Sequence, residues 1–216
     1  MNLSNYYYAF DSALPISFCD DVIKYSLAQK MAKGMVPIKG TPTTDQHGKK
    51  TLGKDEKFRL KQIRNSDIVW LKDNWIYRHV HPFIREANEK AGWNFDLKRS
   101  EPVQFTQYKP GQYYDWHCDA HTTVYEDGHY TGMGRKLSVT CQLTDSSEYE
   151  GGELEFDYRN YSPNKRDELT HVIKAKKILK KGSIVVFPSF VWHRVRPVTK
   201  GTRYSLVVWN LGYPFT

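Results

Sequence analysis

One His-x-Asp tripeptide, His117-Cys118-Asp119, occurs in the chain, which has eight histidines. Residues two apart on an extended strand point to the same face, so the imidazole of His117 and the carboxylate of Asp119 can both reach one metal ion. A third ligand has to come from another segment, and His193, at the end of GSIVVFPSFVWH, is the best candidate. The tripeptide alone is a weak signal, because a surface histidine beside a solvated aspartate also arises by chance.

Two imidazoles and one carboxylate on one face of an octahedron leave three coordination positions open. This ligand set is typical of non-haem Fe(II) oxygenases, whose open positions accept a bidentate oxoacid and O₂. Arg203 strengthens the interpretation, because it follows His193 on the next expected strand. A buried guanidinium is costly unless it is paired, and it binds carboxylates through two parallel hydrogen bonds. The distal carboxylate of 2-oxoglutarate would satisfy Arg203; the alternative is a salt bridge at the rim of the fold.

Two expected strands, KLSVTCQL and TRYSLVVW, each have one apolar face and one face of more mixed character. Side chains alternate between the faces of a strand, so alternate residues of each run lie together. The mixed faces hold Ser138, Thr140, Gln142, Arg203, Ser205, Val207 and Trp209. This pattern predicts a polar cavity between strands, with an ordinary half-exposed strand as the alternative.

The elements that would position these residues begin with two helices. The first is expected over 17–33, with Ser17 as N-cap and Gly34 as the stop. The second is expected over about 74–91, capped by Asp73. Its apolar residues, at near-helical spacing, are Ile76, Val80, Phe83 and Ile84. A strand is expected over 62–71 between the helices, after a polar loop over 35–62 that is either a lid or an unstructured insert.

From Trp93 onward the pattern changes to about nine short strands separated by Gly and Pro turns. They are expected at 94–97, 102–108, 112–119, 136–143, 152–156, 170–175, 182–188, 193–198 and 202–211. Two helices followed by a run of strands predict an α+β protein with a jelly-roll core and the N-terminal helices packed outside. We expect a single domain over 1–216, in which 1–99 provides helical support and a mobile loop and 100–216 forms the catalytic core.

The composition is that of a soluble globular protein, with 39% hydrophobic and 26% charged residues. The odd number of cysteines, namely Cys19, Cys118 and Cys141, argues against a disulfide framework and for a reducing compartment. No apolar run approaches the roughly 18 residues that span a bilayer, and the N-terminus lacks a secretory pattern. A cytoplasmic location without a membrane partner is therefore expected.

The formal net charge of +8 invites a nucleic-acid interpretation. Basic residues concentrate in the segment 34–62, which could equally be a solvated loop. That segment has Phe58 as its only Phe, Tyr or Trp, whereas single-strand binding needs aromatic rings on which bases stack. Nucleic acid is therefore not the favoured partner.

Several other residues near these motifs have plain structural interpretations. His79 and His81 are two apart on a helix and do not share a face, so surface positions are expected for both. His121 is expected to be exposed or to lie behind the metal ligands, and Cys118 to point to the back of its sheet. Tyr113, Tyr114 and Trp116 could line a cleft or only pack, and the sequence leaves this open.

Three runs together resemble the prolyl 4-hydroxylase-type branch of the 2-oxoglutarate/Fe(II) oxygenases, over roughly residues 100–211. They are QYKPGQYYDWHCD, RKLSVTCQLTDSSEYEGGELEF and KKGSIVVFPSFVWHRVRPVTKGTRYSLVVW. The resemblance implies a double-stranded β-helix core, iron on His117, Asp119 and His193, and the C5 carboxylate of 2-oxoglutarate on Arg203. It implies that Tyr108, Val195 and Trp209 line the pocket. With Thr140, Gln142 and Ser205 from the strand faces, they complete the expected co-substrate residues.

The implied activity is hydroxylation of a prolyl residue in a protein or peptide, as in procollagen-proline-type dioxygenases. Fe(II), 2-oxoglutarate, O₂ and ascorbate are the implied cofactors and co-substrates. Asp119 favours hydroxylation over halogenation, because halogenating relatives lose this carboxylate. Gln142 departs from the pattern, since some relatives have a tyrosine there. The alternatives are a nucleic-acid or small-molecule hydroxylase or demethylase of the same cofactor class, and a catalytically inactive jelly-roll binding module.

Overall fold

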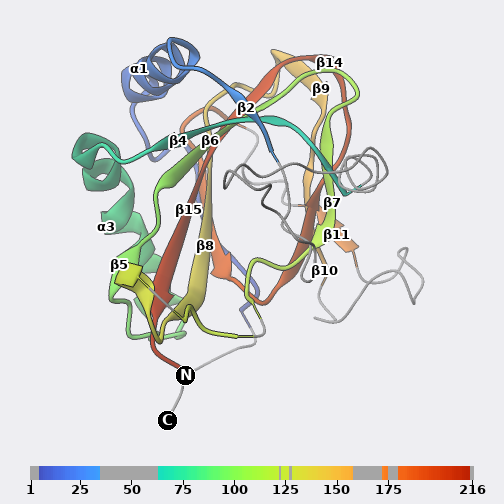
Figure 1. The fold of residues 1–216 in the computed structure, drawn as a ribbon. Helices are drawn as coiled ribbons and strands as arrows, with labels where there is room; N and C mark the ends of the chain where they lie inside the picture. Colours follow the sequence, from blue (N-terminus) through green and yellow to red (C-terminus); the bar gives the residue numbers. More distant parts are fainter. Residues whose placement is uncertain are drawn as a thin grey trace, which may run out of the picture.

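The computed structural model describes residues 5–34, 63–121, 123–126, 128–157, 172–174 and 180–214. Within these residues, eight strands form the main sheet and five form the second sheet. Figure 1 shows how the strands are arranged. In spatial order the main sheet holds β1 (Tyr8–Phe10), β12 (Ile184–Pro188), β8 (Gly134–Gln142), β15 (Arg203–Gly212), β6 (Val103–Tyr108), β4 (Asp67–Leu71) and β2 (Ala32–Lys33), with β5 (Arg99–Ser100) attached to β15. The second sheet holds β11 (Val172–Lys174), β10 (Leu154–Asp157), β13 (Trp192–Val195), β7 (Tyr113–His117) and β3 (Arg64–Asn65). A separate pair joins β9 (Tyr149–Gly151) to β14 (Val198–Gly201).

The two sheets form the double-stranded β-helix that the sequence predicts. Consecutive strands alternate between them: β6 lies in the main sheet, β7 in the second and β8 in the main sheet again. The central strands pair antiparallel in both sheets, as β6–β15–β8–β12 and β7–β13–β10. This alternation places the inner faces of both sheets around one space, which is what a site built from several strands requires.

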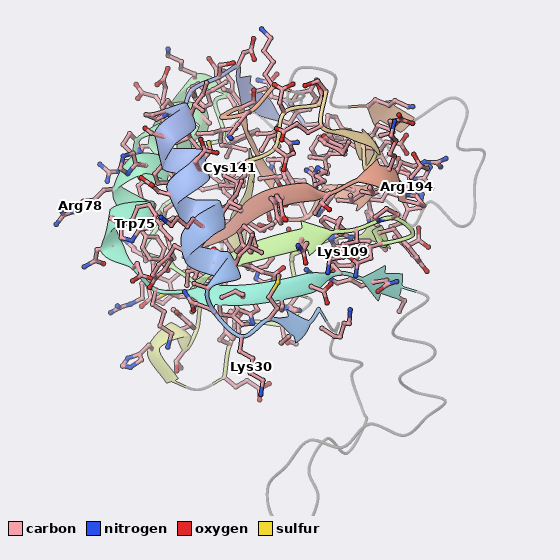
Figure 2. All side chains as sticks on the ribbon, turned by 90° about the horizontal axis from the view of Figure 1, so that it is seen from above. Lys30, Trp75, Arg78, Lys109, Cys141 and Arg194 are labelled. Carbon is pink, nitrogen blue, oxygen red and sulfur yellow. The ribbon has the colours of Figure 1, made fainter. Side chains whose placement is uncertain are left out.

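Two helices, α1 (Ile16–Leu27) and α3 (Asn74–Lys90), cover the outer face of the main sheet (Figures 1 and 2). They bury Phe18, Val22, Ile76, Val80 and Ile84 in one cluster with apolar residues of β8 and β15. The predicted apolar stripe of the second helix is therefore confirmed. The predicted strand faces are confirmed as well, since the apolar positions Leu137, Val139, Cys141, Leu143, Leu206 and Val208 all lie in this cluster.

The predicted ends of the first helix are wrong. The helix begins at Ile16, with Pro15 as N-cap and no side-chain capping bond, so Ser17 is not its cap. It ends at Leu27, well before Gly34. The reason is tertiary: Ala32 and Lys33 pair with Ile68 and Asp67 at the edge of the main sheet, so the chain has to leave the helix earlier.

The single strand predicted over 62–71 is also wrong, because the chain changes sheets within it. Arg64 and Asn65 pair with β7 in the second sheet, whereas residues from Asp67 pair with β6 in the main sheet. The predicted strand at 94–97 does not form, and Asn94 has a positive φ of 51° that interrupts extended backbone. The strand predicted over 193–198 splits into β13 and β14 around Pro197, which has no N–H to donate to a neighbouring strand.

Some predictions lie outside the described residues. The loop over 35–62 is one, and half of the segment 170–175 is another, with β11 covering Val172–Lys174. The division into a support region and a catalytic core stays a prediction. Within the described residues, no helix has the length and apolar character needed to cross a membrane, and all three cysteines are free thiols.

The turn before β12 offers a test of the fold. Gly182 has φ +84°, its carbonyl accepts a hydrogen bond from Leu14 N–H (2.9 Å), and an added Cβ would meet the Leu14 carbonyl oxygen. Gly111 has a similar φ of +80° but open space around it. Gly111→Ala should cost about 1–2 kcal/mol from backbone strain alone, and Gly182→Ala should cost at least about 1 kcal/mol more, from the clash and the weakened hydrogen bond. Urea unfolding of the two variants measures this difference, and equal effects would show that the contact with Leu14 is unimportant.

Candidate functional site

The three predicted metal ligands come together where β7 and β13 pair. His117 is the last residue of β7, and its Cα partner in the ladder is His193 of β13. Asp119 follows β7 and is held by a hydrogen bond from its backbone N–H to the carbonyl of Ser189 (2.9 Å). One ligand atom from each of His117, Asp119 and His193 lies within 4.8 Å of the others. Within the described residues, this trio is the one group of three that could hold a metal ion.

Backbone carbonyls orient both imidazoles. Nδ1 of His117 lies 2.7 Å from the Asp115 carbonyl, and Nδ1 of His193 lies 2.9 Å from the Val191 carbonyl. Each Nδ1–H can donate to its carbonyl, which leaves the lone pair on Nε2 for a metal. The Nε2 atoms lie 3.7 Å and 3.6 Å from the two carboxylate oxygens of Asp119. All three donors therefore face a common point.

The electrostatics of the trio favour a cation. Burial, and then the neighbouring His193, hold the pKa of His117 well below its usual value, so its imidazole is neutral and able to coordinate. Burial opposes ionisation of Asp119, but the two histidines, Arg135 and a hydrogen bond from Ser138 outweigh it and lower its pKa to about 2. Asp119 is therefore a carboxylate at neutral pH.

The inner face of the main sheet forms the opposite wall of the same pocket. Nine of the ten predicted site residues line this pocket, from one sheet or the other: His117, Asp119, His193, Arg203, Tyr108, Thr140, Val195, Ser205 and Trp209. The pocket is narrow, at about 30 Å³, and a cavity of about 670 Å³ lies elsewhere, against α3. The donor set rather than the size marks the narrow pocket as the candidate site.

Arg203 is a buried cation of this pocket. Its side chain is 1% exposed, and its Nη1 atom has no hydrogen-bond partner among the described residues. Its guanidinium carbon lies 5.7 Å from the centre of the Tyr108 ring. A salt bridge at the rim, the alternative in the sequence analysis, does not occur within the described part of the chain. A buried guanidinium with an unused donor fits an incoming carboxylate.

Gln142 does not line the pocket, so the structure does not support its prediction as a co-substrate residue. Its Nε2 donates to the Tyr149 hydroxyl (2.9 Å) and to the Thr144 carbonyl (2.8 Å). Gln142 lies at the end of β8, where its amide is tied to the turn that follows. The two-residue alternation placed it on the correct face but could not show how far along the strand the pocket extends.

Five residues that line the pocket were not assigned to the site by the sequence analysis, which had left Tyr114 open: Arg64, Gln104, Tyr114, Leu154 and Val207. Arg64 is buried and donates to Ser66 Oγ and Gln104 Oε1, and its guanidinium lies 4.6 Å from the centre of the Tyr114 ring. The Tyr114 ring stacks on His117 at 3.4 Å. The argument applied to Arg203, that an arginine inside an expected strand needs a partner, would have identified Arg64 too.

His121, Cys118 and Trp116 do not line the pocket. His121 is exposed, and Cys118 is half-buried with its thiol 3.6 Å from the Ala120 carbonyl. Trp116 is buried beneath the guanidinium of Arg194, so it packs and does not line the pocket. Of the three aromatic residues left open on β7, only Tyr114 lines the site.

Comparison with known proteins gives a consistent result. The sequence profile of the 2OG-Fe(II) oxygenase superfamily matches residues 103–210, which include all three candidate ligands and Arg203. A PKHD-type hydroxylase of Idiomarina loihiensis is 31% identical over 162 residues, covering 75% of this chain and 64% of the relative. The match thus spans less than two thirds of that relative's length.

Two solved structures share the fold over most of the chain. The viral collagen prolyl hydroxylase of Paramecium bursaria Chlorella virus-1, in complex with 2OG, aligns with a TM-score of 0.61 at 22% identity, covering 96% of this chain and 97% of that one. A prolyl hydroxylase from Trichoplax adhaerens, in complex with a peptide fragment of hypoxia inducible factor, aligns with a TM-score of 0.62 at 18% identity, covering 95% and 83%. At these identities the likeness concerns the fold.

Proposed function

The chain belongs to the 2OG-Fe(II) oxygenase superfamily, and from this premise we propose that it hydroxylates a prolyl residue of a protein or peptide. The observation that carries the assignment of the site is the position of His117, Asp119 and His193 opposite the buried, incompletely paired guanidinium of Arg203. The prolyl substrate is supported by the PKHD-type relative and by the prolyl hydroxylases that share the fold.

In this proposal the trio holds Fe(II), and Arg203 holds the distal carboxylate of 2-oxoglutarate. Two imidazole nitrogens and a carboxylate suit Fe(II) and leave coordination positions for the co-substrate and O₂. When bound, the iron would activate O₂, which is the oxidant, and oxidative decarboxylation of 2-oxoglutarate to succinate and CO₂ would supply two electrons, so that one oxygen atom of O₂ enters succinate and the other is inserted into a C–H bond.

The chain's own residues bind, orient and exclude water. The carbonyls of Asp115 and Val191 fix the ring orientations of the histidines. Arg203 lies on the main-sheet wall of the pocket, so a dicarboxylate held there would extend toward the metal ligands on the other wall. Leu154, Val195 and Trp209 supply apolar wall, which limits the water that reaches the reacting atoms.

Substrate identity can be tested with purified, iron-loaded protein. Proline-containing peptides should increase succinate formation over the substrate-free rate and should gain the mass of one oxygen atom on proline. Succinate is followed by NMR and the peptide by mass spectrometry, with ascorbate present. With the His193→Ala variant, the peptides should neither increase succinate formation nor gain an oxygen atom. Peptides in which alanine replaces proline serve as the matched substrate control.

Each alternative substrate class predicts a different result. A modified base in an oligonucleotide, or an oxygen atom placed on a residue other than proline, would refute the prolyl proposal while leaving the cofactor assignment intact. Absence of succinate under all conditions, with no iron bound, would instead support the inactive binding module.

A further inference from the structure

A second concave region lies on the outer side of α3. The cavity of about 670 Å³ is bounded by α3, by the segment leading into β5 and by the 3₁₀ helix η1 (Gly128–Tyr130). A second cavity of about 580 Å³ extends it along α3. The two share His81, Arg85 and Ser100, and we call them together the α3 groove. In Figure 2, Arg78 of this groove lies at the opposite edge of the molecule from Arg194, which follows the candidate ligand His193.

The groove is lined by cations. Arg78, His81 and Arg85 are three and four residues apart on α3 and therefore share a helix face. Lys98 and Arg99 face them from β5 and the segment before it. Among the described residues, no acidic side chain lines the groove, and no ion pair involves the three arginines. Burial and the adjacent Arg85 lower the pKa of His81, and Lys98 is paired with Asp96 (2.8 Å), so the three arginines carry the unpaired positive charge of the groove at neutral pH.

The floor of the groove contains an unsatisfied donor. Asn210 of β15 is 4% exposed, and its Oδ1 accepts a hydrogen bond from Ser100 Oγ (2.9 Å). Ser100 Oγ in turn lies 2.9 Å from Nε2 of His81. Nδ2 of Asn210 has no partner among the described residues. A buried N–H group of this kind is costly unless an acceptor is supplied, and here the acceptor would come from whatever fills the groove.

Much of the remaining lining is apolar or aromatic, with Asn74 as a polar member. The half-buried Leu97 offers apolar surface, and Tyr130 of η1 adds an aromatic ring. Arginine forks suit phosphate oxygens, apolar and aromatic surfaces accept a flat ring, and the Asn210 amide can donate to an acceptor on that ring. The cavity has the size of ordinary small-molecule sites, about 300–1,000 Å³.

We propose that the α3 groove binds a nucleotide unit, with its phosphate on the arginines and its base against the Leu97–Tyr130 wall. This binding would be separate from the hydroxylation site, because Asn210 and the site residue Trp209 are neighbours on β15 that face opposite sides of the sheet. An acidic peptide would satisfy the cations, but a glutamate-rich one has no planar ring to place against Leu97 and Tyr130.

The test is fluorescence anisotropy of a fluorescein-labelled oligo(dT) strand, with competition by unlabelled AMP, inorganic phosphate and a glutamate-rich peptide. Arg85→Glu combined with Arg99→Glu should weaken strand or AMP binding about tenfold or more, because charge-assisted hydrogen bonds to the phosphate would be lost and the new carboxylates would repel it. Lys24→Glu combined with Lys30→Glu makes the same change in charge at exposed positions outside the groove and should have little effect. Asn210→Asp, which introduces a negative charge at the floor, should weaken binding as well.

The competitors distinguish the sources of the phosphate and decide the outcome. Competition by AMP indicates a free nucleotide, and binding of the strand without competition by AMP indicates single-stranded nucleic acid; both support the proposal. Equal losses in the two double variants would overturn it, because general surface charge would then explain the binding. Competition by the glutamate-rich peptide but not by AMP or unlabelled strand would also overturn it, as would no binding at all.

Succinate formation should be unchanged in Arg85→Glu/Arg99→Glu, so a failure of the binding proposal is distinguishable from a failure of the proposed function.

Discussion

Replacing His193 with alanine should abolish stoichiometric Fe(II) binding and, with it, succinate formation. The residue supplies one of three donor atoms that lie within 4.8 Å of one another, and no other described histidine or acidic residue completes such a group. Losing an outer-sphere partner of a metal ligand already costs about 10–100-fold in affinity, so losing a ligand should cost more than about 100-fold. Anaerobic equilibrium dialysis measures iron binding, and NMR measures succinate.

His121→Ala is the matched control, because His121 is an exposed histidine two residues beyond the candidate ligand Asp119. It should bind iron like the unmodified chain. His193 also packs against Phe187, with ring centroids 4.7 Å apart, so its replacement leaves a cavity. His193→Gln retains more of the volume and separates loss of the metal from loss of the fold. Iron binding of undiminished affinity in both His193 variants would show that the trio is not the metal centre.

The side-chain faces of the strands could be predicted from the sequence because strand periodicity is local. Alternation along β8 and β15 separates the apolar cluster from the pocket residues Thr140, Arg203, Ser205 and Trp209. The site follows from the same rule, since His117 and Asp119 are two apart and His193 falls opposite His117 in the ladder. The sequence pointed to His193 as the third ligand by its residue type and its position at the end of an expected strand. The pairing of β7 with β13 explains why its imidazole lies beside that of His117.

The missed features depend on contacts between distant segments. The chain switches sheets at Ser66, which places Arg64 in the pocket. The arginine itself was a signal in the sequence, but no local pattern in QIRNSDIVWL marks the point at which the chain changes sheets. The early end of α1 has the same kind of cause, because residues 32 and 33 pair with β4. Gln142 shares the predicted strand face but does not line the pocket, because periodicity gives a face of the strand and not the length of the pocket along it.

The two buried arginines of the pocket differ in their hydrogen bonding. Arg64 is engaged with Ser66, Gln104 and the Tyr114 ring, so it braces the wall next to His117. Arg203 has an unused donor in the same pocket. The arginine with free hydrogen-bonding capacity is thus the one suited to bind a ligand, and this distinction makes Arg203 the sharper target for mutation.

Arg203→Met should raise the KM for 2-oxoglutarate by about 100-fold, because two charge-assisted hydrogen bonds lost together are worth about 3 kcal/mol. Arg203→Lys keeps the charge but not the planar fork, so its KM for 2-oxoglutarate should lie between that of the unmodified chain and that of Arg203→Met. Iron affinity should be unchanged in both variants, since Arg203 is not among the metal donors. Initial rates of succinate formation against 2-oxoglutarate concentration give KM, and dialysis gives iron binding.

Tyr204→Phe is the matched control for Arg203, since Tyr204 is the next residue of β15 and packs against the opposite, apolar side of the sheet. It loses one hydroxyl, which accepts a hydrogen bond from Gln107 Nε2 (3.2 Å), and should leave the KM for 2-oxoglutarate unchanged. A second measurement avoids turnover altogether: 2-oxoglutarate should raise the melting temperature of the unmodified chain and of Tyr204→Phe, but not that of Arg203→Met at the same concentration. A melting temperature that 2-oxoglutarate raises equally in all three proteins would mean that Arg203 supports the fold and that the co-substrate carboxylate binds elsewhere.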